Sequence, residues 1–387
     1  MSDRPYVGIV GPLGPAQLAC LRSWRHAGLR TAFFQTGVRP LHGFLIHLAD
    51  FYRFLPESVA IKESIAKVGE ECTVHGIAAI TSLSERVALK LWSHRQEGGF
   101  PMTHLMLNEP GLYGVLESKL KQIGIAEQAG LPILPTITLA VVGDSAKLPA
   151  DRLMVLRPDI ARLVRPMFKA EVIGNRSEAE TFLASRSLDE AWIIAQPFVA
   201  GPNLVVHAAR AIDGSWDHRE AYVTEIKFNG LAVSLKPCSL PAELLEACRR
   251  FEKATGLYGV FHYDFIVDEN TGKAFFLEVN PRLGGTTAKV YATGYDEPTL
   301  LVAAHLPFLL ASEFRQQTKR YRAISRIAAL KCVLATIRRP LSSIDFPANS
   351  RTAFIGQALR GMLTYPDEVF SFSDIVGDIA YLIQMCV

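Results

Sequence analysis

The sequence predicts a mixed fold, with an α/β unit at the N-terminus, an α+β unit in the middle and a mostly helical region at the end. Short strand-like runs alternate with helix-like stretches over residues 1–115. Paired strand-like runs dominate residues 116–308, and apolar residues recur at helical spacing in residues 309–387. With 387 residues, of which 49% are apolar and 20% charged, the chain can form more than one core and is not disordered.

The first unit has the alternation of strand and helix that produces a parallel sheet. Its runs are Tyr6–Val10, Ala16–His26, Thr31–Gln35, Ile77–Thr81 and Ser84–Trp92. Three glycines at positions 8, 11 and 14 surround the first strand-to-helix turn, at a spacing that differs from the dinucleotide-binding fingerprint. A helix N-terminus there could hold an anion, but a tight turn is the favoured interpretation.

The second unit begins near Leu116 and mixes helices with strands that lack a βαβ order. A helix is expected over Lys119–Gly130, because glycine ends it and the prolines that follow force an extended connection. The later runs are strand-like Leu153–Pro158, Ala191–Val199 and Asn203–Ile212, and helix-like Pro241–Thr255.

A β-hairpin near residue 270 brings several oxygen-bearing side chains together. Its strands are Val260–Val267 and Ala274–Pro281, joined by a turn-rich connection. If the turn centres on Thr271, Asp264 faces Glu278 and His262 faces Asn280. Since alternate side chains of a strand share a face, Asp264, Glu278 and Asn280 are expected to converge.

Opposed carboxylates repel each other unless a cation neutralises them. The oxygen donors of Asp264, Glu278 and Asn280 suit Mg²⁺, and Mn²⁺ could substitute for it. Arg282 comes two residues after Asn280, just past a proline, and can place a guanidinium beside the cluster, where it would bind phosphate or carboxylate. The next segment, Gly284–Thr287, offers backbone N–H groups and hydroxyls to an anionic ligand.

Charge and composition limit the classes of binding partner that the sequence predicts. The net charge of +3 gives no case for nucleic acid, so small molecules are favoured. Six scattered cysteines indicate neither a zinc cluster nor a disulfide framework. We expect no transmembrane segment and no secretory signal, and therefore a cytoplasmic enzyme; a homodimer is compatible with the sequence, which does not fix the oligomer.

The segment Glu313–Arg339 is strongly basic, with eight basic residues and one acidic residue. Apolar residues are interleaved at helical spacing: Ile324, Ile327, Leu330, Val333, Leu334 and Ile337. A membrane-surface or partner-binding helix would have this pattern. A docked helix with a solvated basic face is the favoured interpretation.

The hairpin resembles the ATP-grasp superfamily, whose last strands carry an acidic residue, a Glu-x-Asn pair and an arginine, as in Asp264 and Glu278–Arg282. The resemblance extends to Glu117–Lys119, where the family has a nucleotide-contacting lysine. It also includes the hinge Gln196–Asn203, whose backbone at Phe198 and Val199 would bond the adenine edge. It implies an N-terminal domain over residues 1–115 and an ATP-grasp domain over residues 116–308. A smaller lid subdomain would span about residues 135–200, and a separate helical region would span residues 309–387.

The sequence departs from the family pattern at three places. Arg157 stands where the family has a second nucleotide lysine, and Asn203 stands where many members have a ribose-binding glutamate. The phosphate flap, usually rich in glycine, is Ile160–Lys169, in which Lys169 could supply a further phosphate contact. The positive charge near the phosphates is kept, with a different geometry.

The chain is most similar to the carboxylate-amine ligases of this superfamily. That similarity implies an ADP-forming ligase that joins an acid to an amine through an acyl phosphate. The implied roles are Asp264, Glu278 and Asn280 for magnesium, Lys119, Arg157 and Lys169 for phosphates, Gln196, Phe198, Val199 and Asn203 for the rest of ATP, and Arg282 for charge stabilisation.

Weaker candidates for substrate contact are His262, Gly285, Thr286, and His207 and Lys227 on neighbouring predicted strands. His262 could be a base for the amine, although a packed neighbour of the site is the favoured interpretation. Two other functions stay open: activation of bicarbonate or another carboxylate, and a catalytically degenerate nucleotide-binding regulatory protein.

Overall fold

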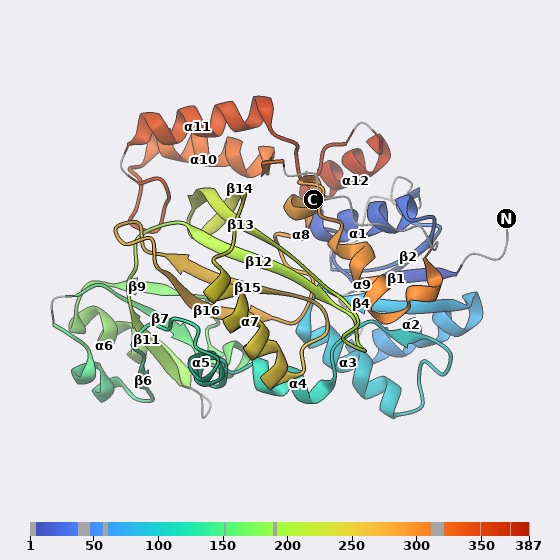
Figure 1. Cartoon of the computed structure of the whole chain (residues 1–387), viewed down its shortest axis with the longest axis horizontal. Coiled ribbons are helices and arrows are strands. Elements are labelled where there is room, and N and C mark those ends of the chain that lie inside the picture. The colour runs from blue at the N-terminus through green and yellow to red at the C-terminus, as the bar shows by residue number, and fades with distance from the viewer. Residues whose placement is uncertain are drawn as a thin grey trace.

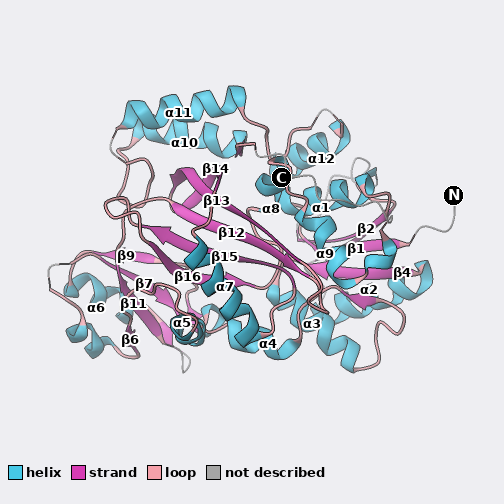
Figure 2. Ribbon diagram, viewed as in Figure 1, coloured by secondary structure: helices cyan, strands magenta, loops and turns pink. Residues whose placement is uncertain are grey.

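A computed structural model represents the 387-residue chain and describes residues 5–37, 47–56, 61–150, 152–188, 192–310, 321–348, 350–371 and 373–386. The N-terminal sheet lies at one end of the longest axis of the molecule, a small four-stranded sheet at the other, and the central six-stranded sheet between them (Figure 1). Helices lie against the sheets and along one edge of the molecule (Figure 2). The predicted mixture of α/β and α+β is confirmed.

The N-terminal sheet has the parallel pairing that its sequence predicts. Its strand order is β3-β2-β1-β4-β5. The elements are β1 (Tyr6–Gly11), α1 (Pro15–His26), β2 (Arg30–Gly37), β3 (Phe51–Pro56), α2 (Ile61–His75), β4 (Ile77–Ser82), α3 (Glu85–Gln96), β5 (His104–Leu105) and α4 (Pro110–Leu116). At the first turn the buried Gln17 side chain lies against Gly11 and Gly14, as in a tight turn.

A small antiparallel sheet of order β6-β11-β7-β9 follows helix α5 (Lys119–Gln128). Its elements are β6 (Ile137–Leu139), β7 (Met154–Pro158), β9 (Glu171–Ile173), α6 (Arg176–Ala184) and β11 (Ile193–Pro197), with the short pair β8 (Val164–Arg165) and β10 (Ser187–Leu188) beside it. Leu139, Leu156 and Ile193 form a core of its own with α6.

The central sheet is antiparallel and has the order β16-β15-β12-β13-β14-β17. Its elements are β12 (Asn203–Arg210), β13 (Asp217–Phe228), β14 (Leu231–Cys238), β15 (Gly259–Val267), β16 (Ala274–Asn280) and β17 (Ala323–Ile324). Helix α7 (Ala242–Thr255) covers one face, where Phe251 packs on Tyr263 and Phe276 with ring centroids 5.8 Å apart in each pair. The opposite face is left for the polar side chains of β15 and β16.

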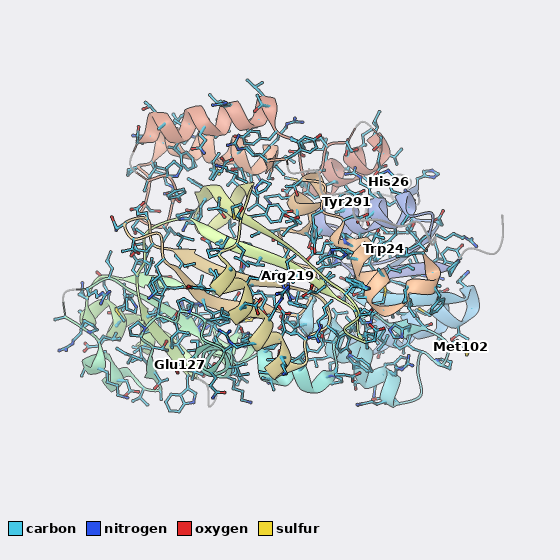
Figure 3. All side chains as sticks on the ribbon, viewed as in Figure 1. Trp24, His26, Met102, Glu127, Arg219 and Tyr291 are labelled. Atoms are coloured by element: carbon cyan, nitrogen blue, oxygen red, sulfur yellow. The ribbon has the colours of Figure 1, made fainter. Side chains whose placement is uncertain are left out.

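Helices α8 (Thr287–Ala292) and α9 (Glu297–His305) join the central sheet to the N-terminal unit. Trp24 of α1 donates its indole N–H to the Pro298 carbonyl over 2.9 Å, and His26 Nδ1 lies 2.8 Å from the Tyr291 hydroxyl (Figure 3). The helix α12 (Ile375–Cys386) belongs to the same junction, because Arg22 of α1 pairs with Asp374 at 2.7 Å and with Asp378 at 2.6 Å.

The basic segment forms helix α10 (Arg326–Arg338), which pairs with α11 (Arg351–Thr364); residues 311–320 lie outside the described part. The helix is docked, as favoured, but the expected apolar face is wrong in part. It buries Ala329, Cys332 and Val333, and leaves Leu330, Leu334 and Ile337 exposed, while Ile324 belongs to β17. Among the described residues, no helix combines the length and apolar character needed to cross a bilayer.

Candidate functional site

The predicted hairpin register is confirmed for the residues of the proposed site. Asp264 pairs with Glu278 and His262 pairs with Asn280, and a bulge shifts the register only between Asp264 and Phe265, on the turn side. The side-chain amide of Asn280 lies 3.2 Å from Asp264 Oδ2 and 3.4 Å from Glu278 Oε1. Strand geometry therefore brings the two carboxylates and one amide together on the face opposite α7.

Glu278 is held between two cations from other elements. Arg157, at the end of β7, lies 2.7 Å from Glu278 Oε2, and Lys119, the first residue of α5, lies 3.5 Å from the same atom. Burial alone would raise the pKa of Glu278, but the charges of Arg157 and Lys119 outweigh burial and lower this pKa to about 2. Glu278 is therefore a permanent anion at physiological pH.

Asp159 and Gln122 explain how these cations reach the hairpin. The carboxylate of Asp159, just after β7, accepts hydrogen bonds from the Ser118 hydroxyl and the Leu120 N–H, both at 2.8 Å, and so anchors the start of α5 beside β7. Gln122, one turn into α5, accepts from the Val279 N–H over 2.6 Å. The edge strand β16 is thus fixed to the helix that carries Lys119.

Asp264 differs from Glu278 because it lacks an adjacent cation. Burial and the nearby charge of Glu278 raise its pKa to about 7. His262 Nε2 lies 3.7 Å from Asp264 Oδ2, but burial and the neighbouring His207 and Arg282 push the pKa of His262 well below its usual value. The imidazole is therefore neutral, and the charge of Asp264 is left without compensation from it.

Arg282 lies just beyond β16, between the hairpin and the N-terminal unit. Its Nη2 donates to Asn280 Oδ1 over 3.3 Å, and its Nε lies 3.3 Å from Glu85 Oε1. Glu85 is the first residue of α3, whose preceding Ser84 caps the helix by accepting from the Val87 N–H. The guanidinium is thereby held beside the cluster without contacting Asp264 or Glu278 directly.

A buried histidine supports the loop after Arg282. His207 of β12 stacks on His262 with ring centroids 5.4 Å apart. Its two ring nitrogens lie 2.9 Å from Glu297 Oε1 and 2.9 Å from the Thr286 hydroxyl. Thr286 is therefore committed to His207, whereas Gly285 faces open space and leaves the backbone accessible.

Replacing Glu297 with glutamine should lower the free energy of unfolding by about 2–4 kcal/mol, since glutamine keeps only one of the two acceptor oxygens that His207 and the Thr287 hydroxyl use in this buried site. Denaturant midpoints measure the effect. The matched change Glu243→Gln, on the exposed side of α7, should shift stability by less than about 0.5 kcal/mol. Equal midpoints for both variants would contradict this role of Glu297.

The hinge between the small and central sheets contains the residues expected to bind the nucleotide base. The Phe198 N–H is already donated to the Leu153 carbonyl over 3.0 Å. Gln196 is buried and bonds Thr136, and Asn203 begins β12 opposite Ile266. Within the described residues, the Phe198 carbonyl and the Val199 N–H are among the hinge groups that make no backbone hydrogen bond, so they can meet an adenine edge.

Lys227 and Lys169 lie away from the carboxylate cluster. Lys227 is buried under the hinge, where Nζ donates to the Gly201 carbonyl over 2.5 Å and burial lowers its pKa to about 8. Lys169 is exposed between β8 and β9. In the same flap Arg162 pairs with Glu117, which joins this segment to the residues just before α5.

Solved structures with the same architecture come from enzymes of very low sequence similarity. An N5-carboxyaminoimidazole ribonucleotide synthetase in complex with ADP shares 13% identity over 88% of each chain, with a TM-score of 0.64. A Bacillus licheniformis L-amino acid ligase shares 15% identity over 83% of this chain and 80% of its own, with a TM-score of 0.62. The chain has the ATP-grasp fold. Neither the protein-family profiles nor the curated proteins contain a match to the sequence.

A Campylobacter jejuni biotin carboxylase has the same ATP-grasp architecture at 14% identity, covering 82% of this chain and 74% of its own with a TM-score of 0.62. Several supporting residues of the site were missed in the sequence, among them Asp159, Gln122, Glu297 and Glu85. Glu297 stands at a helix start, which gives no signal for a partner of His207. Glu85 follows a serine at a predicted helix start, a signal for the helix but not for a partner of Arg282.

Proposed function

We propose that this protein is an ATP-dependent carboxylate-amine ligase that forms an amide or peptide bond and releases ADP and phosphate. One observation carries the proposal: the opposed carboxylates of Asp264 and Glu278 lie in a group that also contains Lys119, Arg157 and Arg282. Phosphoryl transfer needs positioning and charge neutralisation more than covalent chemistry, and this arrangement supplies both.

The nucleotide would lie between the two antiparallel sheets. Its adenine would meet the hinge at the Phe198 carbonyl and the Val199 N–H, and its phosphates would extend toward Lys119 and Arg157. Both cations already lie beside Glu278, so they can neutralise phosphate oxygens next to the same carboxylate. Asn203 would contact the ribose as an amide in place of a carboxylate.

The donor set fits magnesium. Burial and the charge of Glu278 raise the pKa of Asp264, so a cation between the two carboxylates would offset their repulsion. The side-chain oxygen of Asn280, which accepts from Arg282, would add a third oxygen once the amide turns toward the ion. In the part of the chain that the structure describes, no three His, Cys, Asp or Glu side chains form a metal site by themselves. The ion would therefore depend on nucleotide phosphates as further ligands, which is usual for Mg²⁺. It would neutralise the phosphate charge during transfer.

The reaction has two steps. An oxygen of the substrate carboxylate attacks the γ-phosphorus of ATP, and the bond to the β-γ bridging oxygen breaks to give an acyl phosphate and ADP. The amine nitrogen then attacks the acyl carbon, phosphate leaves, and the amine loses a proton. Arg282 would stabilise the charge on the transferred group and on the acyl oxygen. Neutral His262, bonded to the Arg282 carbonyl over 3.2 Å, holds this loop in place.

The raised pKa of Asp264 predicts a pH-dependent metal requirement. Below about pH 7 a proton competes for Asp264, so the half-saturating Mg²⁺ or Mn²⁺ concentration should rise about tenfold per pH unit. The native state holds this proton more tightly than the unfolded chain does. The contribution of Asp264 to the stability of the metal-free protein should therefore fall as the pH rises from about 4 to 7. Metal titrations of ADP formation from pH 5.5 to 8 measure the first effect. A flat profile in the wild type would contradict it, and Asp264→Asn should remove it.

A substrate screen tests the proposed function. ADP release is measured with pools of amino acids and other acids and amines, and each active pool is analysed for its product by mass spectrometry. Amide products that require both an acid and an amine support the proposal. Stoichiometric ADP with bicarbonate alone would assign the second candidate, which the similarity to biotin carboxylase favours. Calorimetric ATP binding without turnover in any pool would contradict a ligase and favour a regulatory protein.

A further inference from the structure

The outer surface of the α10–α11 pair is apolar as well as basic. Five large aliphatic side chains are exposed there by 45–84%. They are Leu330, Leu334, Ile337, Leu359 and Leu363, which we call the apolar strip. Isolated exposed leucines are common, but five on two adjacent helices form a surface that requires an explanation.

Helical spacing groups these side chains on one face of each helix. Positions 330, 334 and 337 share one face of α10, and 359 and 363 share one face of α11, opposite the faces that bury Cys332 and Phe354. The helices are antiparallel neighbours, since Arg326 bonds the Met362 carbonyl and Arg351 bonds the Ile337 carbonyl. Figure 1 shows the pair along the outer edge of the molecule.

The stretch that contains the two helices is strongly basic. From Tyr321 to Thr364 the only acidic residue is Asp345, which is 2% exposed and bonded to Ser342. Seven basic residues occupy the same stretch: Arg322, Arg326, Lys331, Arg338, Arg339, Arg351 and Arg360. This stretch therefore carries a net charge of +6 in a chain whose total is +3, so the remainder is acidic on balance.

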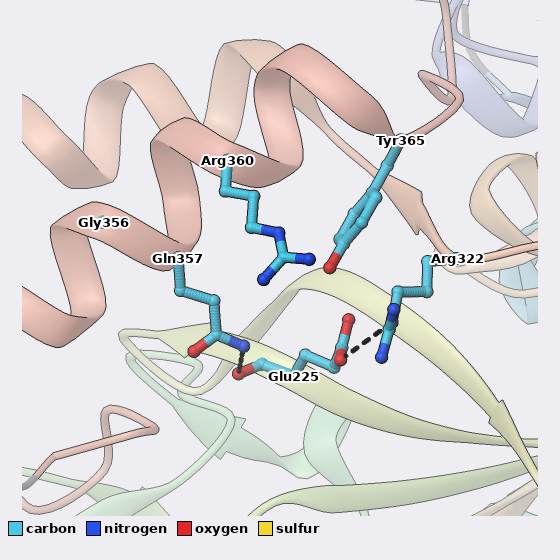
Figure 4. A pocket seen from close by; sticks show the side chains of 6 residues that line it. All are labelled: Glu225, Arg322, Gly356, Gln357, Arg360 and Tyr365. Atoms are coloured by element: carbon cyan, nitrogen blue, oxygen red, sulfur yellow. Dashed lines mark hydrogen bonds and ion pairs between the residues drawn. The ribbon is translucent and has the colours of Figure 1, made fainter.

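A pocket of about 370 Å³ opens on the flank of α11 beside the strip (Figure 4). Arg322 in its wall donates to Glu225 Oε1 over 3.1 Å and neutralises that carboxylate. Arg360 also points into the pocket, and no ion-pair partner for it occurs among the described residues. Gln357 and Tyr365 complete the polar lining. With two guanidinium groups and one carboxylate in its lining, the pocket has a net positive charge, which suits a phosphate group.

We propose that the α10–α11 face docks on the surface of an anionic phospholipid bilayer. The apolar strip would enter the layer between the headgroups, the flanking basic side chains would meet lipid phosphates, and the Arg360 pocket would hold one headgroup. This is the arrangement of a peripheral amphipathic surface, in which apolar burial and electrostatic attraction add. The ATP site on the central sheet would remain outside the membrane.

The positive charge of the α10–α11 face argues against a second copy of this chain as its binding partner. Two such faces in contact would each bring a stretch of +6, and the repulsion would oppose the burial of the strip. A bilayer is also favoured over an acidic protein. The apolar side chains project from two neighbouring helices, and a lipid surface needs no matching groove to receive them.

Vesicle flotation of the full chain tests the proposal, with pure phosphatidylcholine compared with a mixture containing about 30% phosphatidylglycerol. Binding to the anionic vesicles should be at least about tenfold tighter, and should weaken strongly between about 50 and 500 mM NaCl. The double variants Leu334→Asp/Leu363→Asp and Lys331→Glu/Arg338→Glu should each lose at least about tenfold in binding while ADP formation is unchanged. Circular dichroism and thermal melting check that both are folded.

Met102→Asp and Lys253→Glu are matched controls, because both residues are exposed on other parts of the molecule (Figure 3 labels Met102). These variants should bind vesicles as the wild type does. Failure of the wild type to bind anionic vesicles at low salt would overturn the proposal, as would equal losses in the controls. A dimer that becomes monomeric in Leu334→Asp/Leu363→Asp would assign the strip to a second copy. Binding to poly-glutamate as tight as to vesicles would assign the surface to an acidic polypeptide.

Discussion

The Glu278→Gln variant is expected to lose Mg²⁺-dependent ADP formation by about 10³-fold or more while keeping its fold. Glutamine has nearly the same shape but removes the negative charge that Arg157 and Lys119 surround. The metal would lose an anionic ligand, and two cations would be left facing each other without the carboxylate between them. ADP release under saturating ATP, with thermal melting in parallel, measures both parts of the prediction.

The matched control for this variant is Glu243→Gln, which makes the same chemical change on the exposed side of α7 and should retain full activity. The Glu278→Gln variant should lose activity through its metal site and not through nucleotide binding. Because the hinge contacts are unchanged, nucleotide without metal should still bind to Glu278→Gln within a few-fold of the wild type. Retained activity in a folded Glu278→Gln protein would disprove the placement of the site on this hairpin.

Arg282→Ala is expected to lower kcat by about 10²–10³-fold with a small change in the KM for ATP. The guanidinium lies beside Asn280 at the end of the hairpin and away from the hinge, so it would act on the transferred group and not on nucleotide binding. Arg282→Lys keeps the charge but not the two-pronged geometry, and should recover part of the rate. Steady-state kinetics with an acid and amine pair from the substrate screen separate these effects.

Glu85→Gln isolates the ion pair that holds Arg282 in place. It removes the partner of Arg282 across 3.3 Å but leaves the guanidinium present, so its effect on kcat should be much smaller than that of Arg282→Ala. If Glu85→Gln were as damaging as Arg282→Ala, the arginine would serve mainly to join the hairpin to the N-terminal unit. A large rise in the KM for ATP in Arg282→Ala would likewise contradict a role confined to the transferred group.

The hairpin could be predicted from the sequence because its geometry is local. The register follows from the position of the turn, so the pairing of Asp264 with Glu278 needs no knowledge of the remaining chain. The bulge does not disturb this pairing, because it falls after Asp264 on the turn side. The parallel N-terminal sheet was predicted for a similar reason, since the order of strand and helix largely dictates it.

The remaining parts of the site depend on contacts between distant segments. The pairing of Arg157 with Glu278 joins residues 121 positions apart, and Glu85 is 197 positions from Arg282. The buried face of α10 differs from the predicted one for another reason. Periodicity identifies the more apolar face, but close packing against α11 and the central sheet favours small side chains such as Ala329 and Cys332, and leaves the larger Leu330 and Leu334 outside.

The contacts of Arg22 with Asp374 and Asp378 also constrain how the molecule can form. They join segments about 350 positions apart, so α1 cannot acquire its final contacts until the region around α12 has reached it. Loop-closure entropy opposes contacts of this kind early in folding, and the N-terminal sheet should pass through a stage in which this side of α1 is uncovered. The first helix of the chain would then be among the last to be completed.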